Sequence, residues 1–484
     1  MEKKKLNSLI IAREYQEVIL KQLQRNYNKN YHTIAEVDTG LGKRVLMYLL
    51  VKEMFPDKRV LLLLHSTSSY IETYYYFTTQ YGGFTEDEFQ GISSRTPSRL
   101  RIEILENKKS RIVITTPQTF MNVFDKMSTK PLFDIIIINE VDKVVRRQGD
   151  DRIFIYPYNK LLPHFIEHDC WILGMTGTMR DQHVLYDNIQ ESIRIKSEYS
   201  SLESQIPDLH IIRMEKLIQE TDISNYIRFT EVSMVSVEPS QELLEILNFI
   251  NEIIVKLREE IIEETKKDQP KLIEHLSESQ LPLVSGMLSS SSGQHQKYQG
   301  LLLIRKYCTA MQASKYRRFL YRLVKFGLKK DLIQGLPNKN PKIDKVLQLI
   351  NIEPLTSKSV VICSYIDTAA ELDKTLAKSG IQTYQLTGKV RHKMSVINNF
   401  KADKQKSVLI MTSIGERDLD IPQAELLIVY DSINTTKTMY QRMKRTRGGR
   451  VIFLYYDKTF EEQKVSRLLK SIANKYPWSS IISK

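Results

Sequence analysis

Short apolar runs alternate with amphipathic stretches in the first and last parts of the chain. In the first 200 residues, five β-rich runs lie at positions 32–37, 59–65, 111–115, 134–139 and 171–175. A second series of five lies at positions 359–364, 383–386, 407–412, 425–431 and 450–456. Because these runs are apolar on both faces and are separated by helical patterns, each series predicts a parallel β-sheet covered by helices.

The middle of the chain has a different pattern. Between residues 206 and 340 the strand pattern fades and long helical patterns replace it. The predicted division is a first α/β domain at residues 1–205, a helical insert domain at 206–340 and a second α/β domain at 341–484. The insert is also polarised: residues 201–280 contain eight basic and seventeen acidic residues, whereas residues 281–350 contain thirteen basic and two acidic residues.

Composition narrows the class of protein. The 484 residues are 42% hydrophobic and 26% charged, which is typical of globular proteins and excludes collagen-like and disordered chains. The net charge of +14 favours an anionic partner. No segment approaches the roughly 18 apolar residues of a membrane helix, so no membrane partner is expected. Three scattered cysteines form no CxxC pair, which predicts no zinc site and a reducing compartment, the cytoplasm or, in a eukaryote, the nucleus.

A glycine-containing turn follows the first predicted strand. Residues 38–44 read Asp-Thr-Gly-Leu-Gly-Lys-Arg and lead into an apolar helix pattern. A strand, a glycine turn and a helix start predict a phosphate-binding loop in which Lys43 contacts the β- and γ-phosphates. The next residue ordinarily ligates Mg²⁺ through a Ser or Thr hydroxyl, but here it is Arg44, whose guanidinium offers no lone pair to a metal.

The second acidic position of such a site is altered as well. The apolar run at 134–139 ends in Asn139 where a Walker-B strand has the Asp that holds Mg²⁺, while the following Glu140 keeps the carboxylate that polarises the attacking water. An amide supplies no negative charge to a divalent cation. The sequence therefore predicts no metal site, and ATP binding with hydrolysis weakened or lost.

The order of motifs resembles superfamily-2 helicases of the Hef/FANCM/XPF-like group, which act on branched DNA. The matching segments are Arg-Glu-Tyr-Gln at 13–16, Thr-Thr-Pro-Gln at 115–118, Met-Thr-Gly-Thr at 175–178, Val-Ile-Cys-Ser-Tyr at 361–365, Thr-Ser-Ile-Gly-Glu-Arg-Asp-Leu-Asp-Ile-Pro at 412–422 and Gln-Arg-Met-Lys-Arg-Thr-Arg-Gly at 441–448. The resemblance implies two RecA-like parallel-sheet domains in tandem with a helical insertion domain between them. Further departures are Asp418 and Lys444, which replace glycines of the family's motifs, and Gly448, which aligns with the family's final arginine.

The resemblance also implies roles for individual residues. The residues expected to contact ATP are Tyr15, Gln16, Gly40, Gly42, Lys43, Asp420, Arg442 and Arg445. Glu140 and Arg445 are the expected catalytic residues, and both are vestigial if the metal site is lost. Thr116, Gln118 and Thr412 are expected on the DNA track.

A basic segment in the insert is a second candidate DNA site. Lys315, Arg318, Arg322, Lys325 and Lys329 follow spacings of 3, 4, 3 and 4, which predicts one face of a helix suited to phosphate contacts. An alternative interpretation is that this basic stripe is consumed by ion pairs with a facing helix. The acidic residues that would supply these pairs are Glu242, Glu245, Glu252, Glu259 and Glu263.

Together these features predict a helicase-like protein that binds branched or single-stranded DNA in DNA repair, with ATP hydrolysis weakened or lost. It would be a structure-recognition or scaffold subunit, with a nuclease or a sliding clamp as a candidate protein partner. Two alternatives stay open. One is an active ATP-dependent DNA helicase or translocase in which Asp38 or Asp142 recovers the metal, and the other is a protein-interaction scaffold that binds no nucleic acid.

Overall fold

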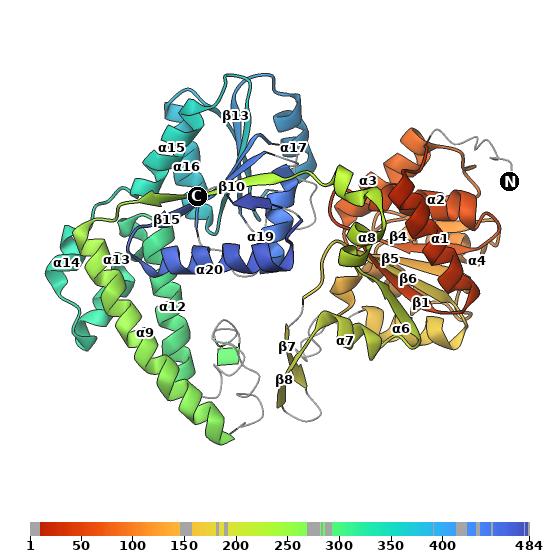
Figure 1. Cartoon of the computed structure of the whole chain (residues 1–484), viewed down its shortest axis with the longest axis horizontal. Coiled ribbons are helices and arrows are strands. Elements are labelled where there is room, and N and C mark those ends of the chain that lie inside the picture. The colour runs from red at the N-terminus through yellow and green to blue at the C-terminus, as the bar shows by residue number, and fades with distance from the viewer. Residues whose placement is uncertain are drawn as a thin grey trace. The chain divides into compact units, whose positions relative to one another are not determined.

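The computed structural model describes residues 10–145, 157–180, 183–187, 192–268, 281, 284–285, 293–390, 392–412, 424–431, 436–446, 449–478 and 480–482. These residues form two compact units, one that ends at Ile227 and one that begins at Arg228 (Figure 1). Each unit is built on its own seven-stranded sheet.

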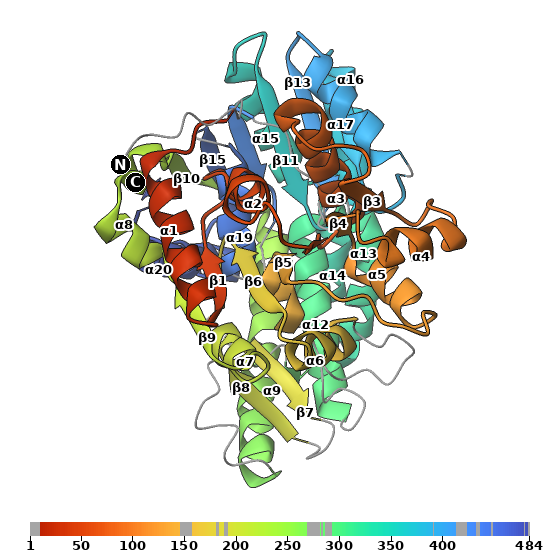
Figure 2. The same cartoon turned by 90° about the vertical axis from the view of Figure 1, so that its right-hand side faces the viewer.

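The first sheet consists of parallel strands throughout. Its spatial order is β3 (Phe89–Ile92), β4 (Ile112–Thr115), β2 (Val60–Leu63), β5 (Ile135–Asn139), β6 (Trp171–Thr176), β1 (His32–Glu36) and β9 (Leu209–Ile212). Figure 2 shows β1, β6 and β5 in the middle of this unit. All five predicted strands are confirmed. The two edge strands, β3 and β9, were not predicted because polar residues such as Gln90 and His210 interrupt their short apolar patterns.

Helices and short helical turns cover this sheet. The helices are α1 (Glu14–Asn28), α2 (Lys43–Leu49), α3 (Thr67–Tyr75), α4 (Ser98–Glu106), α5 (Pro117–Phe124), α6 (Pro157–Glu167), α7 (Glu198–Glu203) and α8 (Met214–Glu220). The turns are the π-helical η1 (Leu50–Met54) and η2 (Tyr76–Tyr81) and the 3₁₀-helical η3 (Val141–Val145) and η4 (Asp222–Tyr226). A separate antiparallel ribbon pairs β7 (His183–Asp187) with β8 (Ser192–Lys196).

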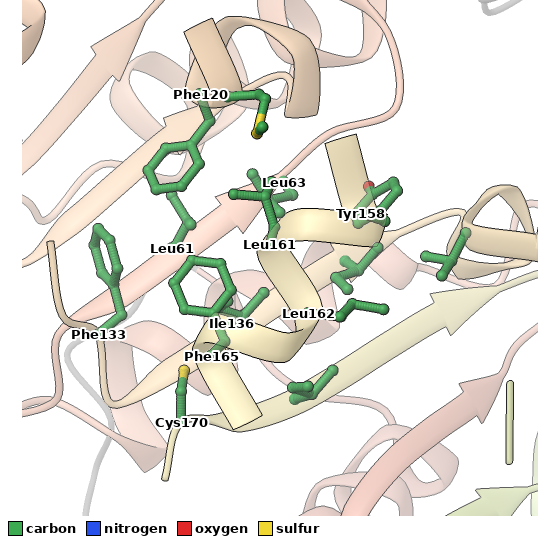
Figure 3. Close-up of a cluster of buried hydrophobic side chains, with 14 of the residues drawn as sticks. Leu61, Leu63, Phe120, Phe133, Ile136, Tyr158, Leu161, Leu162, Phe165 and Cys170 are labelled. Atoms are coloured by element: carbon green, nitrogen blue, oxygen red, sulfur yellow. The ribbon is translucent and has the colours of Figure 1, made fainter. Parts of the chain in front are cut away.

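The core under this sheet is apolar and rich in rings. Phe120 of α5 and Phe165 of α6 pack with Phe133, with ring centroids between 6.1 and 6.5 Å apart. Leu61 of β2 and Ile136 of β5 lie in the same buried cluster (Figure 3). The burial of these large apolar side chains stabilises the packing of the helices against the sheet that includes β1, β5 and β6.

The second sheet is also parallel. Its order is β12 (Gln382–Leu386), β13 (Ser407–Thr412), β11 (Lys358–Cys363), β14 (Leu426–Val429), β15 (Arg450–Tyr456), β10 (Thr230–Val237) and β16 (Ser480–Ile482). Together with the first sheet, it confirms the predicted α/β class with two RecA-like parallel-sheet domains. The prediction that residues 206–340 are helical is wrong at β9 and β10. The sequence of β10 alternates polar and apolar residues, which fits a half-buried position near the sheet edge and lacks the continuous apolar run of a central strand.

Long helices lie between β10 and the rest of the second sheet in the sequence. They are α9 (Gln241–Asp268), α12 (Gly293–Ala310), α13 (Ala313–Leu320), the 3₁₀ turn η5 (Tyr321–Phe326) and α14 (Lys330–Gly335). Helices α9 and α12 lie along each other (Figure 1), and the group shares one apolar core. The sheet itself is covered by α15 (Pro341–Ile352), α16 (Ile366–Lys378), α17 (Lys393–Ala402), α19 (Thr436–Met443), η6 (Lys444–Thr446) and α20 (Phe460–Lys475). None of the described helices is long and apolar enough to cross a membrane.

Candidate nucleotide and nucleic-acid sites

The predicted phosphate loop joins β1 to α2 and needs both of its glycines. Gly40 and Gly42 have φ angles of 87° and 80°, a left-handed conformation that favours glycine. A side chain at Gly42 would place its Cβ 2.5 Å from Nε2 of Gln16. The left-handed backbone path of the loop therefore favours glycine at both positions, and a side chain at Gly42 would also displace the end of the Gln16 side chain.

Tyr15 and Gln16 of α1 lie directly under this loop. The buried Tyr15 hydroxyl donates a hydrogen bond to the carbonyl of Leu41 at 2.9 Å. Burial raises the pKa of Tyr15 above its ordinary value, so the hydroxyl remains a neutral donor. Gln16 accepts a hydrogen bond from the backbone amide of Arg13 at 3.0 Å. The structure thus brings these two predicted nucleotide contacts together with Gly42.

Lys43 begins α2 and lies at the carboxyl ends of the central strands. Its Nζ donates to the carbonyl of Val37 at 3.1 Å and lies 3.9 Å from a carboxylate oxygen of Glu140. Gly177, which follows β6, is close to the same group: a Cβ there would lie 3.2 Å from Nζ of Lys43 and 3.3 Å from the Thr39 hydroxyl. Residues from three strand ends therefore converge where phosphates would bind.

The two positions that ordinarily hold Mg²⁺ are both engaged with α3. The Arg44 guanidinium forms an ion pair with Glu72 at 2.8 Å and lies 4.5 Å from the ring centroid of Tyr76. The Asn139 side-chain amide donates to the Ser69 hydroxyl at 3.3 Å. Neither side chain offers an anionic oxygen, so this donor set does not fit Mg²⁺.

The carboxylates that could recover the metal have other contacts. Asp142 is buried, accepts a hydrogen bond from the Thr176 hydroxyl at 3.0 Å and pairs with Lys143 at 3.1 Å. Asp38 is buried and accepts the amide of Thr39 at 2.6 Å. Within the described ranges, no group of three or more His, Cys, Asp or Glu side chains is arranged to hold a metal. Both carboxylates are therefore engaged in contacts within the first unit.

The sequence did not indicate Ser69 or Glu72 as parts of this site. Both lie on α3, in a Tyr-rich helix with no nucleotide-binding motif. The only available signal was indirect, because a half-buried arginine such as Arg44 requires a carboxylate partner. Nothing in the spacing showed which of the 57 acidic residues would supply it.

The predicted DNA-track residues of the first unit lie at the start of α5. Thr116 caps this helix: its hydroxyl accepts from the Thr119 amide at 3.4 Å and donates to the Thr119 hydroxyl at 2.8 Å. Gln118 is exposed and donates to the Asn122 side chain at 3.0 Å. Thr412 ends β13 in the second unit and is buried. Of these three residues, Gln118 offers the most accessible side chain.

The basic segment is exposed, but it is not one helix face. Helix α13 ends at Leu320, the chain continues as a 3₁₀ turn and Gly327 adopts a φ of 106° before Lys329. A 3₁₀ turn rotates about 120° per residue against about 100° in an α-helix, so a spacing of 3 still aligns two side chains, whereas a spacing of 4 turns them about 120° apart. The prediction of a single aligned stripe is therefore wrong. The five exposed side chains are those of Lys315, Arg318, Arg322, Lys325 and Lys329.

The acidic helix does not neutralise this basic segment. Lys315 pairs with Asp367 at 3.1 Å, whereas Arg318 and Arg322 lie over the ring of Phe319, 4.7 and 5.7 Å from its centroid. Among the residues described, no ion pair joins the basic segment to the glutamates of α9, and α9 packs against α12 and α14. The interpretation that intramolecular ion pairs consume the segment finds no support in these contacts.

The last motifs are described only in part. Asp418 and Asp420 lie outside the described residues, and the side chains of Arg442 and Arg445 are likewise not described, although their backbones belong to α19 and η6. Lys444 is buried, and its Nζ donates to the carbonyl of Arg228 at 3.3 Å. The lysine that replaces a family glycine therefore makes a structural contact within the second unit.

Comparison with known proteins covers nearly the whole chain. The family model "Type III restriction enzyme, res subunit" matches residues 9–181, and "Helicase conserved C-terminal domain" matches residues 341–449. A protein of Methanocaldococcus jannaschii, provisionally named an ATP-dependent RNA helicase, is 24% identical over 95% of this chain and 61% of its own length. The ATP-dependent DNA helicase MPH1 of Pyricularia oryzae is 24% identical over 91% of this chain and 43% of its own length. The chain thus spans less than two thirds of these relatives.

A solved structure shares the fold. The crystal structure of the Pyrococcus furiosus Hef helicase domain aligns with a TM-score of 0.56 and 18% identity, covering 94% of this chain and 98% of that domain. The fold agrees with these comparisons, because two parallel-sheet units are the architecture that the family models, the relatives and the solved structure all indicate. They support assignment of the chain to the superfamily-2 helicases of the Hef/FANCM group.

Proposed function

We propose that this protein binds branched or single-stranded DNA in DNA repair without efficient ATP turnover, as a structure-recognition or scaffold subunit. A nuclease or a sliding clamp is the candidate protein partner. The observation that carries the proposal is the engagement of both metal-ligand positions with α3, Arg44 through Glu72 and Asn139 through Ser69. A chain that keeps the helicase architecture but uses these side chains for internal contacts has little means of turning over ATP.

The nucleotide part of the proposal separates binding from hydrolysis. Lys43, the glycine loop and the underlying Tyr15 and Gln16 supply the groups that would hold phosphates and base. Hydrolysis needs more, because charge develops on the transferred phosphoryl group and Mg²⁺ ordinarily stabilises it. Losing a stabilising effect of several kcal/mol lowers the rate by several powers of ten. Glu140 is retained but has no metal-organised water to act on.

The nucleic-acid part rests on the exposed basic segment and on the relatives. Arg318, Arg322 and Lys325 are exposed cations beside the rings of Phe319 and Phe326. Such an arrangement suits phosphate contacts with adjacent aromatic surface. The matched MPH1 proteins are named DNA helicases and the Methanocaldococcus jannaschii relative is named an RNA helicase, so the choice of DNA as the ligand is part of this proposal.

Binding to fork DNA tests this proposal directly. A labelled fork, a single strand and a duplex are titrated with the native chain in the absence of ATP, and again with the triple variant Lys315→Ala/Arg318→Ala/Arg322→Ala. We expect the native chain to bind and the variant to lose at least about tenfold in affinity. The matched control removes three exposed cations elsewhere in the same unit, Lys374, Lys378 and Lys401. Failure of the native chain to bind any of these DNAs would overturn the proposal.

A further inference from the structure

The two departures from a magnesium site converge on one helix. Arg44 is the second residue of α2 and Asn139 ends β5, so they are far apart in sequence, yet their partners Glu72 and Ser69 lie three residues apart on α3. The contacts are an ion pair at 2.8 Å and a hydrogen bond at 3.3 Å. Residues three apart on a helix lie on the same face, so both contacts reach α3 from the same side.

The arginine contact is sheltered. The side chain of Arg44 is 27% exposed and that of Glu72 is 17% exposed, and the guanidinium also covers the ring of Tyr76 at the start of η2. A partly buried guanidinium that forms an ion pair and also stacks on a ring is bound more strongly than one in a solvent-exposed ion pair. Its charge is already balanced by Glu72, so it neither needs nor attracts a further counter-ion.

We infer that Arg44, Glu72, Asn139 and Ser69 form a brace between the phosphate loop, β5 and α3 that stands in place of the magnesium ion, so that nucleotide binds here as the metal-free anion. This inference rests on the nucleotide binding proposed above. The ligand class is a nucleoside diphosphate or triphosphate. Lys43 and the loop amides hold its phosphates, and no divalent cation contributes to its affinity.

Electrostatics argues in the same direction. In an ordinary site a carboxylate and a hydroxyl draw Mg²⁺ to the phosphates. Here the equivalent positions carry a guanidinium that is already paired with Glu72 and a neutral amide, so neither supplies an anionic oxygen to a divalent cation. Asn139 is turned to donate its amide hydrogens to Ser69. Arg44 and Asn139 therefore lack the oxygen ligands of a magnesium site, and their side chains make the contacts of the brace instead.

The test measures ADP affinity with and without magnesium, which avoids any contribution from turnover. A fluorescent ADP is titrated into the full native chain in Mg²⁺ and in EDTA, and into Arg44→Thr/Asn139→Asp. For the native chain we expect the two affinities to agree within about twofold, whereas the variant should bind about tenfold or more tightly in Mg²⁺. A native affinity that falls tenfold in EDTA, or no ADP binding in either condition, would overturn the inference. Fork-DNA binding is measured separately, so either result leaves the proposed function to stand or fail on its own.

A second measurement covers a variant that fails to fold. The melting temperature is compared for the native chain, Arg44→Met, Glu72→Gln and the double variant. Each single change should lower it by about 2 to 4 °C, and the double variant should lose no more than the larger single loss. Additive losses would show that Arg44 and Glu72 do not act as one unit. The control pair is Glu17 and Lys21 on α1, which are 56% and 68% exposed and 3.9 Å apart, and whose changes should alter the melting temperature by less than about 1 °C.

Discussion

The phosphate loop and the basic segment at α13 and η5 both contain lysines and arginines, but these side chains are paired within the protein at the loop and exposed in the basic segment. At the loop, Lys43 donates to a backbone carbonyl beside Glu140, and Arg44 is paired with Glu72. In the basic segment, Arg318 and Arg322 are exposed, lie over Phe319 and have no carboxylate partner among the residues described. Internal partners make a cation structural, whereas exposed cations without them remain available to an anionic ligand. The net charge of +14 does not distinguish the two uses.

The largest effect is expected where a cation is fully compensated. Lys342 of α15 and Glu461 of α20 are 0% and 1% exposed, with Nζ 2.6 Å from the carboxylate. Changing Lys342→Met removes the cation that contacts this buried carboxylate and should lower the free energy of unfolding by about 3 to 5 kcal/mol, measured by urea denaturation. The exposed pair Lys339 and Asp344 is the control, and Lys339→Met should cost less than about 1 kcal/mol. Equal costs would remove the distinction between compensated and exposed cations.

A large effect on binding, without an effect on stability, is expected at the basic segment. Replacing Lys315, Arg318 and Arg322 by alanine should reduce the log–log dependence of DNA affinity on salt by about 2 to 3 units, because each lost phosphate contact accounts for about one. The free energy of unfolding should stay within about 0.5 kcal/mol of the native value. An unchanged salt dependence would place the DNA elsewhere on the protein.

The reverse pattern is expected for Arg44. The single variant Arg44→Ala should lower the free energy of unfolding by about 1 kcal/mol, since it removes a partly buried ion pair and a ring contact. Its affinity for fork DNA should stay within about twofold of the native chain. The matched variant Arg318→Ala should do the opposite. If both variants changed the same quantity, the contrast between the two regions would be lost.

The smallest effect concerns a histidine at the start of β1 in the first sheet. The Nδ1 of His32 accepts the backbone amide of Ile172 at 3.1 Å, and burial lowers the pKa of His32 below its ordinary value of 6.5, an effect that the nearby Asp208 partly offsets. Because the folded pKa is depressed, the stabilisation is present above about pH 6.5 and is lost as the pH falls through the folded pKa.

This acid sensitivity can be isolated by one substitution. In His32→Gln, the side-chain oxygen can still accept the Ile172 amide but does not titrate. Between about pH 7.5 and 5.5, we expect the free energy of unfolding to fall further in the native chain than in the variant. The difference between the two falls should be less than about 1 kcal/mol. Burial lowers the pKa of His164 in the same direction, so the variant should keep part of the native pH dependence. Identical profiles would show that His32 does not contribute.

The sequence predicted what depends on local pattern and missed what depends on distant contacts. The central strands were predictable because burial on both faces requires continuous apolar runs, and Lys43 because its loop has a recognisable spacing. Strand β10 was missed because it precedes α9 and α12 in sequence but pairs with β15. The break after Leu320 and the partnership of Arg44 with Glu72 depend on packing that no spacing encodes. The placement of Tyr15 under the loop, in contrast, follows the motif from which it was predicted.

The central claim is that the side chains in place of the metal ligands no longer support ATP turnover. The most direct measurement is phosphate release by the native chain with Mg²⁺, ATP and fork DNA, beside Lys43→Ala and beside Arg44→Thr/Asn139→Asp. We predict that the native rate equals that of Lys43→Ala and that the double variant is faster. If the native chain released phosphate at about one per second and Lys43→Ala did not, the central claim would be contradicted.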